Sequence, residues 1–274
     1  MIAAAALLLG LATPAPSPTP EPYQIYKRAM EHLAALPQPA YIIDTEHWIT
    51  VSRFSGGSSD THDWDERRIF DSTNRRECVL NVPFNPSHHT PQIGESYFAP
   101  DTWLIGQRQP APASDSSNIA PDLSDLKTIA SVISIGKQAY DIRLVAVETL
   151  THGASAFHLS LHPRSDPMRH NLRELWINTS TYDIMRAVIE GNYRPTYSDM
   201  VQDTFVSEDF GRIGPYWLMI HHVWTYGDPF SSLKYQDDAT STAMQFPPEI
   251  PGWFFDAKLF LLHLGDVPAI IGGP

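Results

Sequence analysis

The sequence has a single cysteine, Cys78, which excludes an internal disulfide and a metal site built from several thiolates. Because Cys78 stands in the apolar run Cys78–Leu80, we expect its side chain to pack as a small hydrophobic group. Basic residues are also scarce, since 19 lysines and arginines stand against 31 acidic residues. A phosphate-binding surface needs clustered lysine and arginine, so nucleic acid is not expected as a partner.

The sequence also lacks a long apolar run. The longest one, Met1–Leu11, has about 11 residues, whereas a helix that crosses a bilayer needs about 20, so we expect no transmembrane span. The run is typical of a signal peptide instead, and small residues follow it up to Ala15. We therefore predict a signal peptide over 1–15, a proline-rich spacer over 16–22, and an exported, periplasmic or extracellular protein. A disordered cytosolic N-terminus is the alternative.

Charged residues are few as well, at 18% of the chain, while 24 prolines and 11% aromatic residues are plentiful. This composition suits strands and turns more than helices. One helix is predicted over Tyr23–Leu36, where apolar residues recur at helical spacing before prolines end it. A second, short helix is possible over 256–264.

The rest of the chain shows the alternation of apolar and polar residues that strands require. About eleven strands are predicted, at 41–54, 64–71, 75–82, 103–105, 126–135 (which could also be helical), 140–150, 155–162, 173–178, 184–193, 201–210 and 216–226. No crossover helix separates them, so the sheet should be antiparallel and mostly a meander. Stretches rich in proline, serine and aspartate predict long loops at 83–100 and 107–125. The fold class is mainly β (α+β), in a single domain over 23–264.

One helix followed by a curved antiparallel sheet of about eleven strands resembles the LolA/LolB group of periplasmic lipoprotein carriers. Four segments are similar to lipoprotein-sorting-like exported bacterial proteins of that superfamily, at 140–150, 157–161, 173–178 and 182–184. The resemblance covers roughly 23–262, by element order more than by identity. It implies an unclosed half-barrel, with the helix as a lid and an apolar groove that holds acyl chains. It also implies binding without covalent chemistry and without a cofactor, with lipid or lipoprotein acyl chains as partners.

Several strands are apolar on both faces, which indicates that both faces are covered. In a half-barrel, the helix and loops can cover one face of the sheet, and a ligand can cover the other. Candidate groove residues are Ile43, Trp48, Ile49, Val51, Leu144, Trp176, Leu218, Ile220 and Trp224. Two packed sheets with a filled core would give the same pattern. The alternative function is therefore a secreted β-rich interaction domain in an envelope assembly, with an envelope protein as its partner.

The sequence gives no catalytic or metal-binding motif. His158 and His162 lie four residues apart on one predicted strand, about 13 Å, which is too far to share an ion. Neighbours on a strand point to opposite faces, so His221 and His222 cannot chelate one ion together. The segment Gly153–Phe157 lacks the second glycine of a nucleophile elbow. We therefore predict no metal site and no enzymatic activity.

A polar network is predicted from Glu148, His158 and Arg173, which should meet across neighbouring strands. Such a network could contact a lipid headgroup. It could equally be ordinary cross-strand pairing on the outer face of the sheet.

Overall fold

The computed structural model describes residues 20–54, 56–72, 74, 76–85, 92–95, 136–150, 153–165, 170, 172–193, 202–227 and 234–272. The predicted signal peptide (1–15), most of the spacer, the strands predicted at 103–105 and 126–135, and the loop at 107–125 lie outside these residues.

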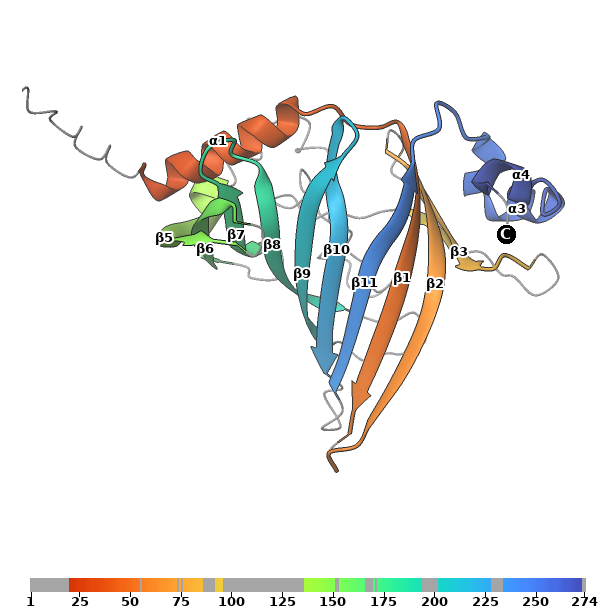
Figure 1. Cartoon of the computed structure of the whole chain (residues 1–274), viewed down its shortest axis with the longest axis horizontal. Coiled ribbons are helices and arrows are strands. Elements are labelled where there is room, and N and C mark those ends of the chain that lie inside the picture. Colours follow the sequence, from red (N-terminus) through yellow and green to blue (C-terminus); the bar gives the residue numbers. More distant parts are fainter. Residues whose placement is uncertain are drawn as a thin grey trace, which may run out of the picture.

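Eleven antiparallel strands form one sheet, which includes every strand of the described residues (Figure 1). They are β1 (Tyr41–Arg53), β2 (Ser59–Asp71), β3 (Arg76–Val82), β4 (Gln92–Glu95), β5 (Tyr140–Thr149), β6 (Ser155–Pro163), β7 (Leu172–Asn178), β8 (Ile184–Tyr193), β9 (Gln202–Ile213), β10 (Tyr216–Gly227) and β11 (Lys234–Gln245).

The sheet consists of two meanders joined at their first and last strands. Its order is β4-β3-β2-β1-β11-β10-β9-β8-β7-β6-β5, so β1 pairs with β11 in the middle while β4 and β5 stand at the two edges. The predicted unclosed antiparallel sheet with an N-terminal helix is therefore confirmed. Two members differ from the prediction: β11 was not predicted, and β4 lies inside the stretch 83–100 that was predicted to be a loop.

Helix α1 (Pro22–Ala35) precedes the sheet and lies across its β5–β8 end (Figure 1). Proline at the first helical position and the Glu21 side chain, which accepts a hydrogen bond from the Gln24 backbone N–H, fix its start. Its buried stripe packs on β5 and β6. Together with apolar residues of β5–β9 it forms the α1 core, whose helical members are Ile25, Tyr26, Ala29, Met30 and Leu33.

Three short helical segments follow the sheet and lie at its other end, near β3 (Figure 1). They are η3 (Gly252–Phe255), α3 (Ala257–Leu262) and α4 (Val267–Ile271). Asp256 caps α3 by accepting hydrogen bonds from two backbone N–H groups. These segments bury Phe254, Phe260 and Ile271 against β1–β3 and so form the C-terminal core. The fold thus continues beyond residue 264, where the predicted domain ended.

The two cores lie on opposite faces of the sheet. In the C-terminal core, Ile43 of β1 pairs with Ile69 of β2. Trp48, five residues after Ile43 on the same strand, must point to the other face, because side chains alternate along a strand. We call the face covered by α1 the inner face and the face covered by the C-terminal helices the outer face.

Candidate ligand-binding surface

A single row of directly paired residues crosses nine strands on the inner face. From β5 to β2, the members of this inner row are Leu144, Leu159, Leu175, Ala187, Glu208, His222, Ala239, Trp48 and Trp64. The first four residues pack in or against the α1 core. The last five belong to neither core. The inner face is therefore apolar and covered by a helix at one end, and it continues as a different surface at the other.

Aromatic rings dominate that second part of the inner row. The Trp48 ring stacks on Trp64, with centroids 5.8 Å apart, and meets the edges of His222 at 5.0 Å and Trp224 at 6.5 Å. The Arg68 guanidinium lies 5.2 Å from the Trp48 ring centroid. Trp48 is buried within this group, whereas Trp64 is 36% exposed.

The same face carries a second pair of stacked rings, Tyr226 and Tyr235, whose centroids are 5.0 Å apart. Asp237 lies beside them and accepts hydrogen bonds from Thr50 and from the Tyr226 hydroxyl. We define the aromatic surface as Trp48, Trp64, His222, Trp224, Tyr226 and Tyr235. Rings of this kind offer wide apolar contact together with polar edges.

Three carboxyl groups are buried on the inner face, those of Asp44, Glu46 and Glu208. Burial raises the pKa of Glu208 to about 8. The pKa of Asp44 rises to about 7, first because of burial and then because of repulsion from Glu46. Asp44 accepts a hydrogen bond from the Ser241 hydroxyl, and Glu46 accepts one from the Trp48 indole N–H. Glu208 is therefore largely uncharged at neutral pH.

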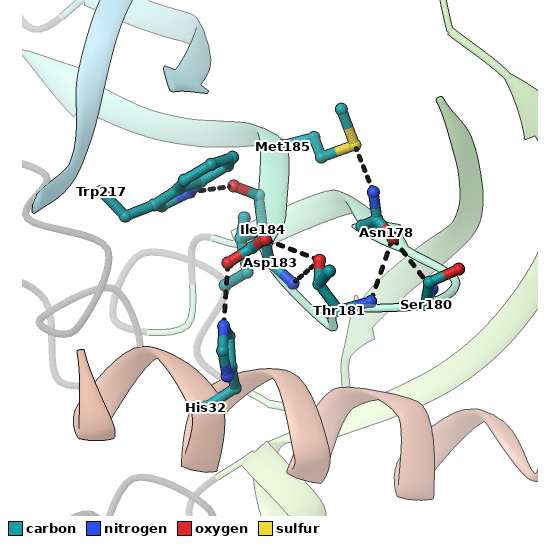
Figure 2. Close-up of polar contacts among 8 residues, drawn as sticks. All are labelled: His32, Asn178, Ser180, Thr181, Asp183, Ile184, Met185 and Trp217. Carbon is teal, nitrogen blue, oxygen red and sulfur yellow. Dashed lines mark hydrogen bonds and ion pairs between the residues drawn. The ribbon is translucent and has the colours of Figure 1, made fainter. Parts of the chain in front are cut away.

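Polar contacts anchor α1 to the turn between β7 and β8, and we call them the helix anchor (Figure 2). His32 of α1 lies 2.8 Å from the Asp183 carboxylate, which also accepts a hydrogen bond from the Thr181 hydroxyl. The Asn178 side chain accepts bonds from the backbone N–H groups of Ser180 and Thr181 and so holds the turn. These contacts tie α1 to the turn between β7 and β8.

The nine predicted groove residues do not share one face. Trp48 and Leu144 lie in the inner row, and Trp224 lies on the inner face. The other six lie on the outer face. The pairing places Ile43, Ile49, Val51, Trp176 and Leu218 there, and the side chain of Ile220, the unpaired bulge residue, lies against the outward side of Gly211. Of these, Ile43 is buried in the C-terminal core and Ile49 is 37% exposed.

A bulge in β10 explains part of this division. The register shifts between Met219 and His221, so the side chains do not alternate across Ile220. Leu218 pairs with Gly211 whereas His222 pairs with Glu208, three positions away on β9. Leu218 and His222 therefore point to opposite faces, although an even spacing along a regular strand would place them together.

The predicted network around His158 lies on the outer face. His158 contacts Glu148 and Glu174, each at 3.0 Å, and stacks on Trp176 with centroids 4.2 Å apart. Arg173 does not join them and pairs with Glu190 instead. Of the two predicted roles, the arrangement fits cross-strand pairing.

The network extends into an outer row, one register position away from the inner row. Trp176, Arg186, Asp209 and His221 are directly paired from β7 to β10. Arg186 forms a salt bridge with Asp209, and His221 lies 3.0 Å from both Asp209 and Asp238. These contacts raise the pKa of His221, mainly through its hydrogen bond with Asp209. His221 and His222 point to opposite faces, as predicted.

Chemistry beyond binding has little support among the described side chains. Burial raises the pKa of the Cys78 thiol to about 12, as expected for a packed hydrophobic group. Within the described ranges, no group of three or more histidines, cysteines or acids is placed to hold a metal ion. No helix in the same residues has the length and apolarity needed to cross a membrane.

Glu208 was missed by the sequence analysis. In sequence it shares its parity with Phe210, a member of the α1 core, and this acid at an apolar position was the available signal. Its meaning depends on the pairing of β9 with β8 and β10, which local sequence does not reveal.

Comparison with known proteins gives only distant similarity. No protein-family model and no curated protein matches the chain. Among solved structures, a DUF1329 family protein from Desulfovibrio piger is 14% identical, with a TM-score of 0.43 over 86% of this chain and 98% of that one. A LolA superfamily protein from Nitrosomonas europaea is 13% identical, with a TM-score of 0.38 over 84% of this chain and 96% of that one.

A third solved structure, from Vibrio parahaemolyticus, is described as an outer membrane lipoprotein-sorting protein domain. It is 8% identical, with a TM-score of 0.42 over 88% of this chain and 98% of that one. At these identities the similarity concerns the arrangement of helix and sheet, and the function must be inferred from the side chains of this chain.

Proposed function

We propose that this chain is an exported binding protein that holds a lipid acyl chain, or the acyl chain of a lipidated partner, on the inner face of its half-barrel. The observation that carries this proposal is the division of the inner row. Its first four residues pack in or against the α1 core, and it then continues into the aromatic surface, which belongs to neither core. An acyl chain lying there would remove apolar area from water, worth about 25 cal/mol per Å². No covalent chemistry is required.

The first experiment asks whether lipid accompanies the protein. The chain is secreted from a bacterial host, purified without detergent and analysed by native mass spectrometry. We expect bound acyl lipid, and after delipidation we expect a fatty acid to bind with a negative heat-capacity change. Absence of both would contradict the proposal and favour the envelope interaction domain with a filled core.

The second experiment locates the chain. A fatty acid brominated along its tail quenches tryptophan fluorescence only at short range. We expect quenching of the wild-type protein to be largely lost when Trp48→Phe, Trp64→Phe and Trp224→Phe are combined, because these are the three tryptophans of the aromatic surface. Trp176→Phe is the matched control, because Trp176 lies on the outer face, stacked on His158. Equal quenching of the triple variant and of this control would place the ligand elsewhere.

A further inference from the structure

Glu208 stands at the boundary between the two parts of the inner row. On one side it pairs with Ala187, which is buried in the α1 core, and on the other with His222, which contacts the Trp48 ring. Phe210, two residues further along β9 on the same face, also belongs to the α1 core. The carboxyl group therefore lies where the helix-covered region ends and the aromatic surface begins.

One oxygen of this carboxyl group is buried without a hydrogen-bond partner. Glu208 is only 3% exposed, and its Oε2 atom has no hydrogen-bond partner among the described residues. Leaving a buried polar atom unsatisfied costs free energy, so native proteins rarely do so without a reason. Two other acids are buried on this face, and each accepts a hydrogen bond: Asp44 from Ser241, although its second oxygen has no partner, and Glu46 from Trp48.

We propose that Glu208 binds the polar end of the acyl chain, with its carboxyl O–H donating a hydrogen bond to the carbonyl oxygen of the ligand. The tail then extends away from α1, over the aromatic surface. The raised pKa of Glu208 is consistent with Glu208 as the donor of this hydrogen bond, because a protonated carboxyl group can donate. The proposal rests on the proposed function and adds which chemical group the site recognises and where it lies.

The site places one polar group, the Glu208 carboxyl, next to apolar rings. An acyl chain has the same order, with a polar carbonyl at one end and an apolar tail. On the Ala187 side, apolar side chains of the α1 core pack against one another beneath the helix. Rings of Trp48 and Trp224 supply the apolar contact on the other side. The same carbonyl chemistry occurs in free fatty acids and in acyl esters, and the test separates these two sources.

The test measures displacement of a fluorescent apolar probe by three ligands of equal chain length: tetradecane, methyl myristate and myristic acid. For the wild-type protein we expect methyl myristate to displace the probe at a lower concentration than tetradecane. In Glu208→Leu this preference should fall about three- to ten-fold, the factor that one hydrogen bond supplies. In Glu208→Gln it should persist, because the amide N–H also donates. Whichever of ester and acid depends more on Glu208 identifies the source.

Controls separate the possible failures. Asp209→Asn changes the neighbouring residue, which faces outward to Arg186 and His221, and should leave the ester preference unchanged. Circular dichroism and thermal unfolding establish that each variant is folded. If Glu208→Leu keeps the full ester preference while all ligands bind, the role of Glu208 is overturned and the carrier function stands. If the wild-type protein binds none of the three ligands, the carrier function itself is overturned.

Discussion

The inner and outer rows lie one register position apart where both cross β7–β10, yet they are stabilised in different ways. The outer row satisfies its polar groups within the sheet, through contacts such as those of Arg186, Asp209 and His221. The inner row depends on a cover, which α1 provides over Leu159 and Leu175. Beyond Ala187 it reaches Glu208, whose buried oxygen has no partner in the described chain. The comparison shows that the outer row satisfies its charged groups by pairing across strands, whereas the inner row packs beneath a helix at one end and reaches a buried carboxyl oxygen without a partner beyond it.

The largest expected effect is on the covered part of the inner row. Leu175→Ala should lower the free energy of unfolding by about 2–5 kcal/mol, because it leaves a cavity beneath α1. Arg186→Ala in the outer row should cost less than about 1 kcal/mol, since this salt bridge is partly exposed. Urea denaturation of both variants gives the comparison. Equal losses would show that the two rows do not differ as described.

The second prediction uses the pH dependence of stability. The pKa of Glu208 is about 8 in the folded protein against an ordinary value of 4.5, so the unfolded chain releases this proton first as the pH rises. Its contribution to stability is therefore complete below about pH 4.5 and is lost as the pH rises towards 8. For one proton, the free energy of unfolding falls by at most about 1.4 kcal/mol per pH unit. Between pH 5 and 7 the total loss is about 2.5 kcal/mol.

The measurement is the difference between the wild-type protein and Glu208→Gln in urea denaturation across this range. The variant cannot ionise, so its stability curve should be flatter. Asp44 and His221 also have raised pKa values and contribute with the same sign. They are present in both proteins, so their contributions cancel in the difference. Parallel curves would mean that Glu208 is solvated in the folded state.

The third prediction concerns the close approach between α1 and the segment that leads into β5. A Cβ atom added at Gly136 would lie 2.4 Å from the ring of Tyr26, a buried residue of α1. Gly136→Ala should therefore displace the helix and lower the free energy of unfolding by about 1–3 kcal/mol. Gly252→Ala is the control, because nothing lies within 4 Å of its added Cβ. Thermal unfolding compares the two, and an unchanged midpoint for Gly136→Ala would contradict the packing of α1.

Much of the fold was predictable from local sequence. The helix predicted over Tyr23–Leu36 is observed as Pro22–Ala35, and all strands except β4 and β11 begin or end near their predicted positions. The exception of β11 has a physical cause, because its inner-face positions include Asp237 and Ser241, so the apolar alternation of a strand is absent.

The site was less predictable, because it depends on pairing between strands distant in sequence. Trp48 and Trp224 are among the predicted groove residues, but the bulge at Ile220 and the pairing of β1 with β11 decide which residues share their face. Alternation along β1 separates Ile43, Ile49 and Val51 from Trp48, and the bulge in β10 separates Leu218 and Ile220 from Trp224. With Trp176, six of the nine predicted residues therefore lie on the opposite face. Composition indicated an apolar surface, and only the register locates it.

The smallest expected effect belongs to the outer row. Asp209 and Asp238 raise the pKa of His221, so its contribution to stability is present below its ordinary pKa of 6.5 and is lost as the pH rises through the higher folded value. His221→Gln should therefore lower stability by about 0.5–1 kcal/mol at pH 5.5 and by less at pH 9, because the group is partly exposed and screened. Ligand affinity should not change, since His221 faces away from the aromatic surface. Urea denaturation at the two pH values and probe displacement at pH 7 test both statements. A loss of ligand binding would contradict the second one, because it would mean that a residue of the outer face affects binding on the inner face.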